Sequence, residues 1–258
     1  MQNKKNVSVS IPLFDPTLSW EYYINLENEF LEFLKYVPLE KDHYKVWSPF
    51  LGNMLNNTGS VIDSFLKTSL FSDTFDDIDD VQDARKRFES NIKLDMNIYR
   101  SVFEKKYDLS KKKIFDLKTY SPFLPFSAWE EEKSLNWWAD YTNYKHDQFT
   151  NRHKASLRTT LDALGGLFVL NVIHLETRMI LFREGFIQST SPLFGESVLE
   201  IIKNIEPFRS HHKIRAKSRL FGYVFENERG ISDIEKQALL SPWVMKTYRD
   251  PSPRLKSQ

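Results

Sequence analysis

The sequence predicts an all-α protein: a helical bundle of about five helices, with a less regular C-terminal third that has room for a short strand or hairpin. Two observations favour this class. Apolar residues recur every three to four positions over long stretches, and the 258 residues include only 8 glycines. The balance of 36 Lys and Arg against 35 Asp and Glu excludes a globally basic nucleic-acid coat. The absence of cysteine excludes disulfide scaffolds, thiolate zinc sites and cysteine nucleophiles.

Three parts are expected along the chain: an extended N-terminal segment over 1–19, the bundle over 20–188, and a C-terminal extension over 189–258 that packs on the bundle. No apolar region of signal-peptide length follows the lysines near the start. The most apolar stretch, 161–182, still contains Asp, Glu and Arg, whereas a membrane span needs roughly 20 nearly uncharged residues. We therefore expect a cytoplasmic protein with no membrane segment.

Start signals and apolar stripes predict the first two helices. Ser19 can cap a helix that begins at Trp20 and is ended by Pro38. A second helix follows Ser48 and Pro49, because proline suits the first helical position. Both helices carry apolar stripes at helical spacing: Trp20, Tyr23, Ile24, Phe30, Leu31, Leu34 and Val37 in the first, and Phe50, Leu51, Met54, Leu55, Val61, Ile62, Phe65 and Leu66 in the second.

An acidic run precedes the third predicted helix, which spans Ile78 to Lys106. Six Asp residues lie in 72–83, and several of them suit the first turn, where the helix dipole favours negative charge. Their spacing matches no EF-hand loop, so we expect a solvated helix start and not a cation site. Residues 107–126 are rich in lysine and proline and predict a loop with one short strand.

Two longer helices are predicted in the centre of the chain. The fourth runs from about Ser127 to Asp147, and Glu130 completes a capping-box pattern with Ser127. The fifth begins near Asn151 and continues to about Arg183, with Gly185 just past its end, as helix C-termini prefer.

The fifth predicted helix contains residue types that are unusual for a helix core. A glycine inside a helix costs about 1 kcal/mol, so Gly165 and Gly166 predict the close approach of a neighbouring helix. Asn171 and His174 lie in the same apolar run, and buried polar groups must be hydrogen-bonded. We expect a core histidine satisfied by a neighbour, the alternative being a ligand-binding role.

Signals weaken beyond Pro192. Residues 194–205 predict one more helix, 220–225 a strand, and 233–245 a short helix interrupted by Pro242. Between them lies a basic segment without an acid, whose cations are Arg209, Lys213, Arg215, Lys217 and Arg219. Aromatic residues flank this segment, and the combination suits phosphate contact with base stacking. A solvated basic loop is the alternative.

The densest chemistry lies at the end of the predicted fourth helix. One face of that helix carries a stripe of amides and carboxylates: Asn136, Asp140, Asn143 and Asp147. His146 lies at the edge of this stripe beside Lys145, and the helix dipole favours a cation there.

Arg152, His153 and Lys154 open the following segment, so positive or titratable groups gather at one helix junction. Such a junction could hold phosphate. There His146 would act as general acid or base, and Lys145 or Arg152 would stabilise developing charge. The alternative is a capping and salt-bridge cluster that includes the nearby aspartates.

Three pieces in order resemble the HEPN superfamily of helical bundles: Asn53–Lys67, Pro125–Trp129, and Trp138–Asp147 followed by the apolar stretch Leu157–Phe182. The resemblance covers roughly residues 20–185. It implies a bundle of four or five helices, often a homodimer, in bacterial toxin–antitoxin, phage-defence or RNA-processing proteins.

The resemblance also implies site residues for a metal-independent endoribonuclease. Catalytic HEPN proteins carry an Arg four to six residues before the His, and no Arg occupies that window before His146. The resemblance therefore implies catalytic roles only for Asn143, Lys145 and His146, with Asp147 as a further site residue.

We expect neither a metal nor a cofactor. The pairs His146/His153 and His211/His212 lack the i, i+4 spacing of helical metal ligands, and no H-E-x-x-H motif occurs. Phosphate-loop, dinucleotide and nucleophile-elbow motifs do not occur in the sequence either.

Two functions therefore stand side by side. The first is a HEPN-like protein of bacterial stress or phage defence that binds or cleaves RNA. The second is a non-catalytic helical interaction module, a scaffold or regulatory subunit that acts through protein partners, which the 14% aromatic content suggests. Small-molecule binding in the bundle core is a third hypothesis, with only Asn171 and His174 behind it.

Overall fold

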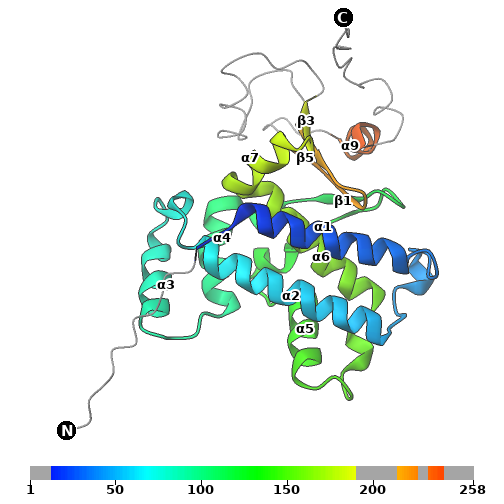
Figure 1. The fold of residues 1–258 in the computed structure, drawn as a ribbon, viewed down its shortest axis with the longest axis horizontal. Helices are drawn as coiled ribbons and strands as arrows, with labels where there is room; N and C mark the ends of the chain where they lie inside the picture. The colour runs from blue at the N-terminus through cyan, green and yellow to red at the C-terminus, as the bar shows by residue number, and fades with distance from the viewer. Residues whose placement is uncertain (1–12, 190–213, 226–231, 241–258) are drawn as a thin grey trace, which may run out of the picture. The chain divides into compact units, whose positions relative to one another are not determined.

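The computed structural model describes residues 13–189, 214–225 and 232–240 (Figure 1). The chain forms two units: the first joins Met1–Lys112 to Leu124–Ile173, and the second joins Lys113–Phe123 to His174–Gln258. Helices occur in both units, and the second also holds a five-stranded antiparallel sheet. The predicted all-α fold is therefore wrong, and the fold is mixed α and β. The predicted boundary at 188 also differs from the division between the units.

The first unit begins with two helices that lie side by side and run in opposite directions (Figure 1). Helix α1 (Pro16–Phe33) starts earlier than predicted, because the Asp15 carboxylate accepts a hydrogen bond from the Leu18 amide at 2.9 Å. Ser19, the predicted cap, lies inside α1 and is buried. Helix α2 (Pro49–Ser69) begins as predicted, with the Ser48 hydroxyl as its cap.

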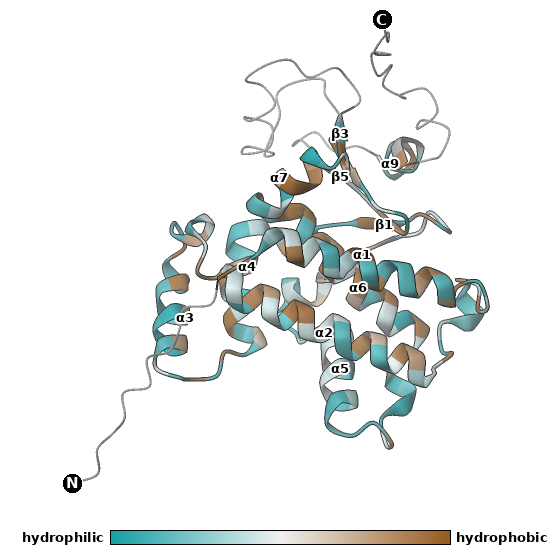
Figure 2. Ribbon diagram, viewed as in Figure 1, coloured by the Kyte–Doolittle hydropathy of each residue, from teal (hydrophilic) through white to brown (hydrophobic). Residues whose placement is uncertain are grey.

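The third predicted helix is interrupted, which contradicts the expected single span. Its first half is α3 (Asp79–Glu89) and its second is α4 (Met96–Tyr107). Asn91 between them has φ 58°, and the Asp95 carboxylate caps α4. Acids of the predicted run pair with cations of α3 and α4: Arg85–Asp76, Lys105–Asp80 and Lys106–Asp77. Figure 2 shows α3 as mostly hydrophilic, in keeping with these exposed pairs.

The fourth predicted helix is also shorter than expected. Residues Ser127–Glu131 form a 3-10 turn without a side-chain cap, so the capping-box prediction is wrong. Glu132 has φ 55° and ends the turn, and helix α5 (Asn136–His146) begins beyond it. Helix α6 (Leu157–Ile173) is buried along almost its whole length and packs against α1, α2 and α5. These four helices form the core of the first unit.

The fifth predicted helix ends at Ile173, and α7 (Leu175–Arg183) follows as the first helix of the second unit. His174 between them has extended backbone angles and takes the N-cap position of α7. Glu176 in the first turn of α7 suits a helix start, because the helix dipole favours an acid there.

The sheet of the second unit has the strand order β2-β1-β5-β4-β3. Its strands are β1 (Ile114–Asp116), β2 (Pro122–Phe123), β3 (Ile187–Ser189), β4 (Ile214–Lys217) and β5 (Phe221–Phe225). Phe115 pairs with Gly222, and Arg215 pairs with Val224. The predicted strand over 220–225 is confirmed as β5, whereas the lysine-rich loop holds two strands and not one.

Helix α9 (Asp233–Leu240) packs on the central strands of this sheet. Leu240 is fully buried against Phe115 and Val224. A Cβ on Gly222 would lie 2.5 Å from a Leu240 methyl carbon, so a side chain at this position would displace Leu240. The short helix predicted from residue 233 is confirmed to Leu240. The predicted helix over 194–205 lies outside the described residues.

Candidate nucleic-acid interface

Two glycines of α2 fix the position of α5. A Cβ on Gly52 would lie 1.9 Å from the Tyr144 hydroxyl, and a Cβ on Gly59 would lie 2.6 Å from the Tyr141 ring. Both tyrosines are buried. The two helices therefore approach as closely as glycine allows, and the C-terminal turn of α5 is anchored to α2.

The N-terminal end of α5 is anchored as firmly as its C-terminal turn. The Trp137 indole N–H donates to the Pro125 carbonyl at 2.7 Å. The same indole would lie 3.2 Å from a Cβ on Gly166 of α6. The predicted close approach at the glycines of this helix is therefore confirmed at Gly166, and its neighbour is the Trp-rich helix.

Lys145 lies against the aromatic ring that anchors α5. Its ammonium donates to the Tyr141 hydroxyl at 3.1 Å and lies 5.3 Å from the centre of the ring. The hydrogen bond to Tyr141 raises the pKa of Lys145, so this exposed side chain stays positively charged. The lysine is thus a held cation at the protein surface.

His146, the last residue of α5, is exposed. Within the described part of the chain its side chain has no hydrogen bond and no ion pair, so its imidazole is open to solvent. Asn143 is also exposed, and its carbonyl accepts from the Asp147 amide and from the Asn151 side chain. The Asp147 carboxylate has a structural role, because it accepts from the Thr150 amide at 3.0 Å and closes the turn.

The cations that follow α5 each have a neighbour. The Arg152 guanidinium lies 5.1 Å from the centre of the Trp47 ring. The Lys154 ammonium lies 3.8 Å from the Asp140 carboxylate, whose pKa is raised by burial. His153 is exposed between them. The junction therefore has features of both predicted alternatives. The Lys154–Asp140 ion pair and the turn closed by Asp147 belong to a capping and salt-bridge cluster, whereas the exposed basic groups around them suit phosphate binding.

A short extended segment brings Trp47 to this junction from far away in the sequence. Trp47 forms an isolated antiparallel bridge with Ser156, and the Val46 carbonyl accepts from the Leu157 amide at 2.8 Å. One step along, Arg158 lies over the Tyr44 ring at 5.3 Å. Two aromatic residues of this segment thus face two arginines.

We name the exposed groups Lys145, His146, Arg152 and His153 the basic corner. Sequence reasoning found all four. It missed Trp47 and Phe149, of which Phe149 is 94% exposed and lies in the turn within the same stretch. A phenylalanine in an otherwise polar turn was the available signal for Phe149, whereas nothing in the sequence linked Trp47 to Arg152.

The basic segment predicted over 209–219 does not form one exposed face in its described part. Arg209 and Lys213 lie outside the described residues. Arg215 is buried on β4 and donates to the Gln188 side chain at 3.3 Å. Lys217 donates to the Leu240 carbonyl, and burial, followed by the charge of Arg215, lowers its pKa. Arg219 is exposed.

The polar residues Asn171 and His174 of the predicted fifth helix are both buried. Asn171 is fully buried, accepts from the Ser19 hydroxyl at 2.8 Å and donates to the Leu167 carbonyl at 2.9 Å. His174 is fully buried, and burial, with the nearby Arg178 charge, lowers its pKa to about 3. No group of three or more His, Asp or Glu side chains suited to a metal ion occurs among the described residues.

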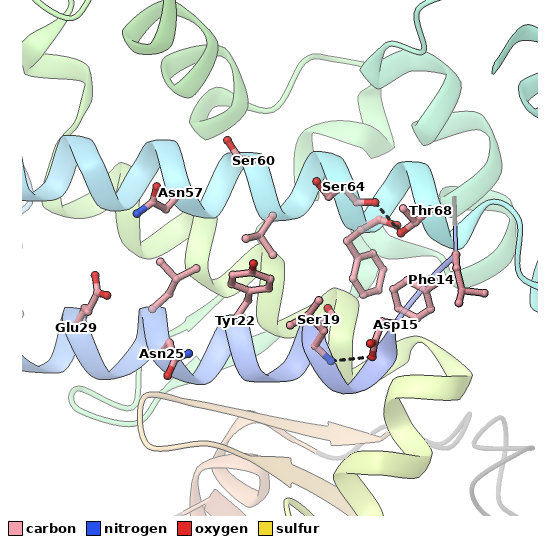
Figure 3. Close-up of a pocket in the computed structure, with 15 residues that line it drawn as sticks. Phe14, Asp15, Ser19, Tyr22, Asn25, Glu29, Asn57, Ser60, Ser64 and Thr68 are labelled. Carbon is pink, nitrogen blue, oxygen red and sulfur yellow. Dashed lines mark hydrogen bonds between the residues drawn. The ribbon is translucent and has the colours of Figure 1, made fainter. Parts of the chain in front are cut away.

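A second feature of the first unit is a groove of about 650 Å³ between α1 and α2 (Figure 3). Leu18 and Tyr22 line it and are 46% and 49% exposed. Figure 3 shows Asp15 and Glu29 far apart along α1, with Tyr22 between them. The lining contains these two acids and no Lys, Arg or His.

Comparisons of the chain with family models, with curated proteins and with solved structures gave no match. In the described ranges, no helix by itself has both the length and the hydropathy to cross a bilayer. Helices α6 and α7 have sufficient length and hydropathy only when the two are joined across His174, where the chain bends by 88°.

Proposed function

We propose that this protein binds RNA at the basic corner and cleaves it with His146, in the manner of a HEPN-like protein of bacterial stress or phage defence. The proposal depends mainly on four exposed side chains. Lys145 and His146 end the firmly anchored helix α5, and Arg152 and His153 lie in the 3-10 turn that follows it. Phosphate contacts by such cations supply most of the affinity for RNA. The proposal includes the homodimer that the resemblance implies, or a protein partner in its place, and a cytoplasmic location. It needs no metal or cofactor.

The positions of four residues at the end of α5 suggest their roles in the proposed cleavage. His146 is the exposed imidazole and serves as general acid or base on a ribose 2′-hydroxyl or on the leaving oxygen. Lys145 lies next to it, is kept protonated by Tyr141, and can stabilise charge on the phosphate. Asp147 organises the turn through Thr150, and Asn143 supports the same turn through its carbonyl.

The binding test compares two double variants of equal charge. Lys145→Gln/Arg152→Gln removes two cations from the basic corner, whereas Lys35→Gln/Lys133→Gln removes two exposed cations that pair with glutamates elsewhere. Fluorescence anisotropy with a labelled RNA over a range of KCl gives the salt dependence. The logarithm of the RNA-binding constant falls linearly with the logarithm of the salt concentration. In the corner variant this slope should be less steep by about 1.4, because each lost phosphate contact removes about 0.7. Equal slopes for the two variants would contradict binding at the corner.

Cleavage is tested with His146→Gln, and the control is His43→Gln, which replaces a half-buried histidine outside the basic corner. Loss of a positioned acid or base should slow cleavage by about 10²–10⁴-fold and leave RNA affinity close to wild type. Wild-type protein that binds RNA and leaves it intact would refute cleavage and retain binding.

The α1–α2 groove favours the interaction module as a second candidate. Its exposed apolar side chains Leu18 and Tyr22 and its two acids suit an amphipathic helix with basic ends, contributed by a partner protein. A labelled Leu/Lys amphipathic peptide should bind wild type, lose affinity to Leu18→Asn/Glu29→Gln, and keep it for Tyr36→Ser, an exposed aromatic outside the groove. Equal binding to all three proteins would remove this candidate.

A further inference from the structure

The basic corner carries two aromatic side chains that the first unit does not cover. Phe149 is 94% exposed, and Trp47 is 41% exposed. Within the described residues no aromatic ring contacts Phe149. An exposed phenylalanine does not contribute to a core, so packing gives no reason for this side chain at the tip of a turn.

Trp47 is held in place before any ligand binds. Its backbone bridges to Ser156, and the neighbouring Val46 carbonyl accepts from Leu157. The Arg152 guanidinium lies 5.1 Å from the ring centre, a cation–π distance. The indole is therefore preorganised beside the guanidinium, and Trp47 stays partly open to solvent.

The charges around these rings are mainly positive. Lys145, His146 and His153 are exposed in the same stretch as Phe149. Of the nearby acids, Asp147 accepts from Thr150 and half-buried Asp140 lies beside Lys154. Half-buried Asp63 of α2 is also close enough to act on the charge of Lys145. Anionic groups thus meet available cations beside exposed rings.

We infer that the basic corner binds unpaired nucleotides, with one base stacked on Phe149 and another against the Trp47–Arg152 pair. Sequence-tolerant binding of single strands combines cations along the backbone with aromatic rings under the bases. A double helix offers its phosphates to the same cations but keeps its bases stacked inside, so it cannot use the rings. The inference rests on the proposed RNA binding and narrows its ligand to single-stranded segments.

The experiment uses full-length protein, a labelled 12-nucleotide oligo(A) RNA and a 12-base-pair RNA duplex at one salt concentration. Wild type should prefer the single strand. Phe149→Leu, which keeps an apolar side chain but removes the ring, should weaken single-strand binding by at least about five-fold, the lower end of what one stacked base contributes. Phe149→Tyr should restore it, and duplex binding should stay unchanged in both variants. Oligo(dA) in parallel shows whether the ribose hydroxyl adds to recognition.

Controls separate stacking from folding and from charge. Phe149 is so exposed that its replacement leaves the core intact, and Tyr36→Leu removes an 84% exposed ring outside the corner. Trp47→Leu tests the second stacking surface. If RNA binds but Phe149→Leu and Trp47→Leu both match wild type, or duplex and single strand bind equally, stacking is refuted and the proposed function survives. If no RNA binds at low salt, both fail.

Discussion

His174 is an imidazole from which water is excluded, placed at the N-cap of α7. Burial favours its neutral form, and the positive Arg178 adds to the effect, so its pKa falls to about 3. In an unfolded chain a histidine has a pKa of about 6.5. Between these values the unfolded chain binds one proton more than the folded chain, so acid favours unfolding.

This difference predicts acid sensitivity at mild pH. The free energy of unfolding should be fully retained above about pH 6.5 and should fall by about 1.4 kcal/mol per pH unit below it, or about 2 kcal/mol by pH 5. Urea titrations at pH 8, 6 and 5 measure this loss. His174→Asn should flatten the profile, whereas His153→Asn, an exposed histidine, should not. Identical slopes in His174→Asn and wild type would assign the sensitivity to other groups.

Single residues also show where sequence reasoning works. The rule that a buried amide needs partners predicted a hydrogen-bonded Asn171, and Ser19 and Leu167 supply them. The rule cannot name partners that are 152 residues apart. Trp47 was missed for the same reason, because its place beside Arg152 depends on a bridge to Ser156 that no local pattern encodes.

At the level of elements, apolar periodicity found the helical regions but overran their ends. It predicted unbroken helices through Asn91, Glu132 and His174, where the chain turns. Asn91 and Glu132 adopt positive φ, which costs little for Asn and is uncommon for Glu, so tertiary packing outweighs local preference at Glu132. The strands were harder to predict, because two or three residues are too few to show alternation.

The contact between α2 and α5 gives an element-scale prediction. Gly59→Ala should destabilise the protein by about 1–3 kcal/mol, because its Cβ would enter the Tyr141 ring and the backbones would have to separate. Asn53→Ala, at an exposed position of α2, controls for helix propensity and should be neutral or stabilising. Chemical denaturation measures both.

A double-mutant cycle then identifies the cause. Gly59→Ala should cost much less when Tyr141 is also replaced by Ala, since the clash partner is gone. Additive losses would show that the tight contact is not what Gly59 provides. Since Tyr141 also orients Lys145, the same variants report on how the basic corner is held.

At the scale of the whole molecule, each unit has a hydrophobic core of its own. In the second unit, Leu240 of α9 closes one face of the sheet over Phe115 and Val224. The all-α prediction failed here because the sheet draws its strands from three separated parts of the chain. The sequence predicted β5, which is five residues long and apolar, and one short strand within 107–126, where the structure has β1 and β2.

Leu240→Ala should therefore weaken the second unit selectively, by about 2–5 kcal/mol for a buried leucine. Hydrogen exchange should show lost protection for amides of β1 and β5 and unchanged protection in α1 and α2. Ile234→Ala, on the same helix but 80% exposed, is the matched control. Equal loss of protection in both units would show that they unfold as one.

The pairing of β1 with β5 also bears on how the protein is made. Phe115 leaves the ribosome about a hundred residues before Gly222, its partner in the ladder. Closing so long a loop is entropically costly and slow. During synthesis the helical unit can be completed first, while β1 waits for β5 with an aromatic side chain uncovered. In this interval the nascent chain is most in need of protection by chaperones.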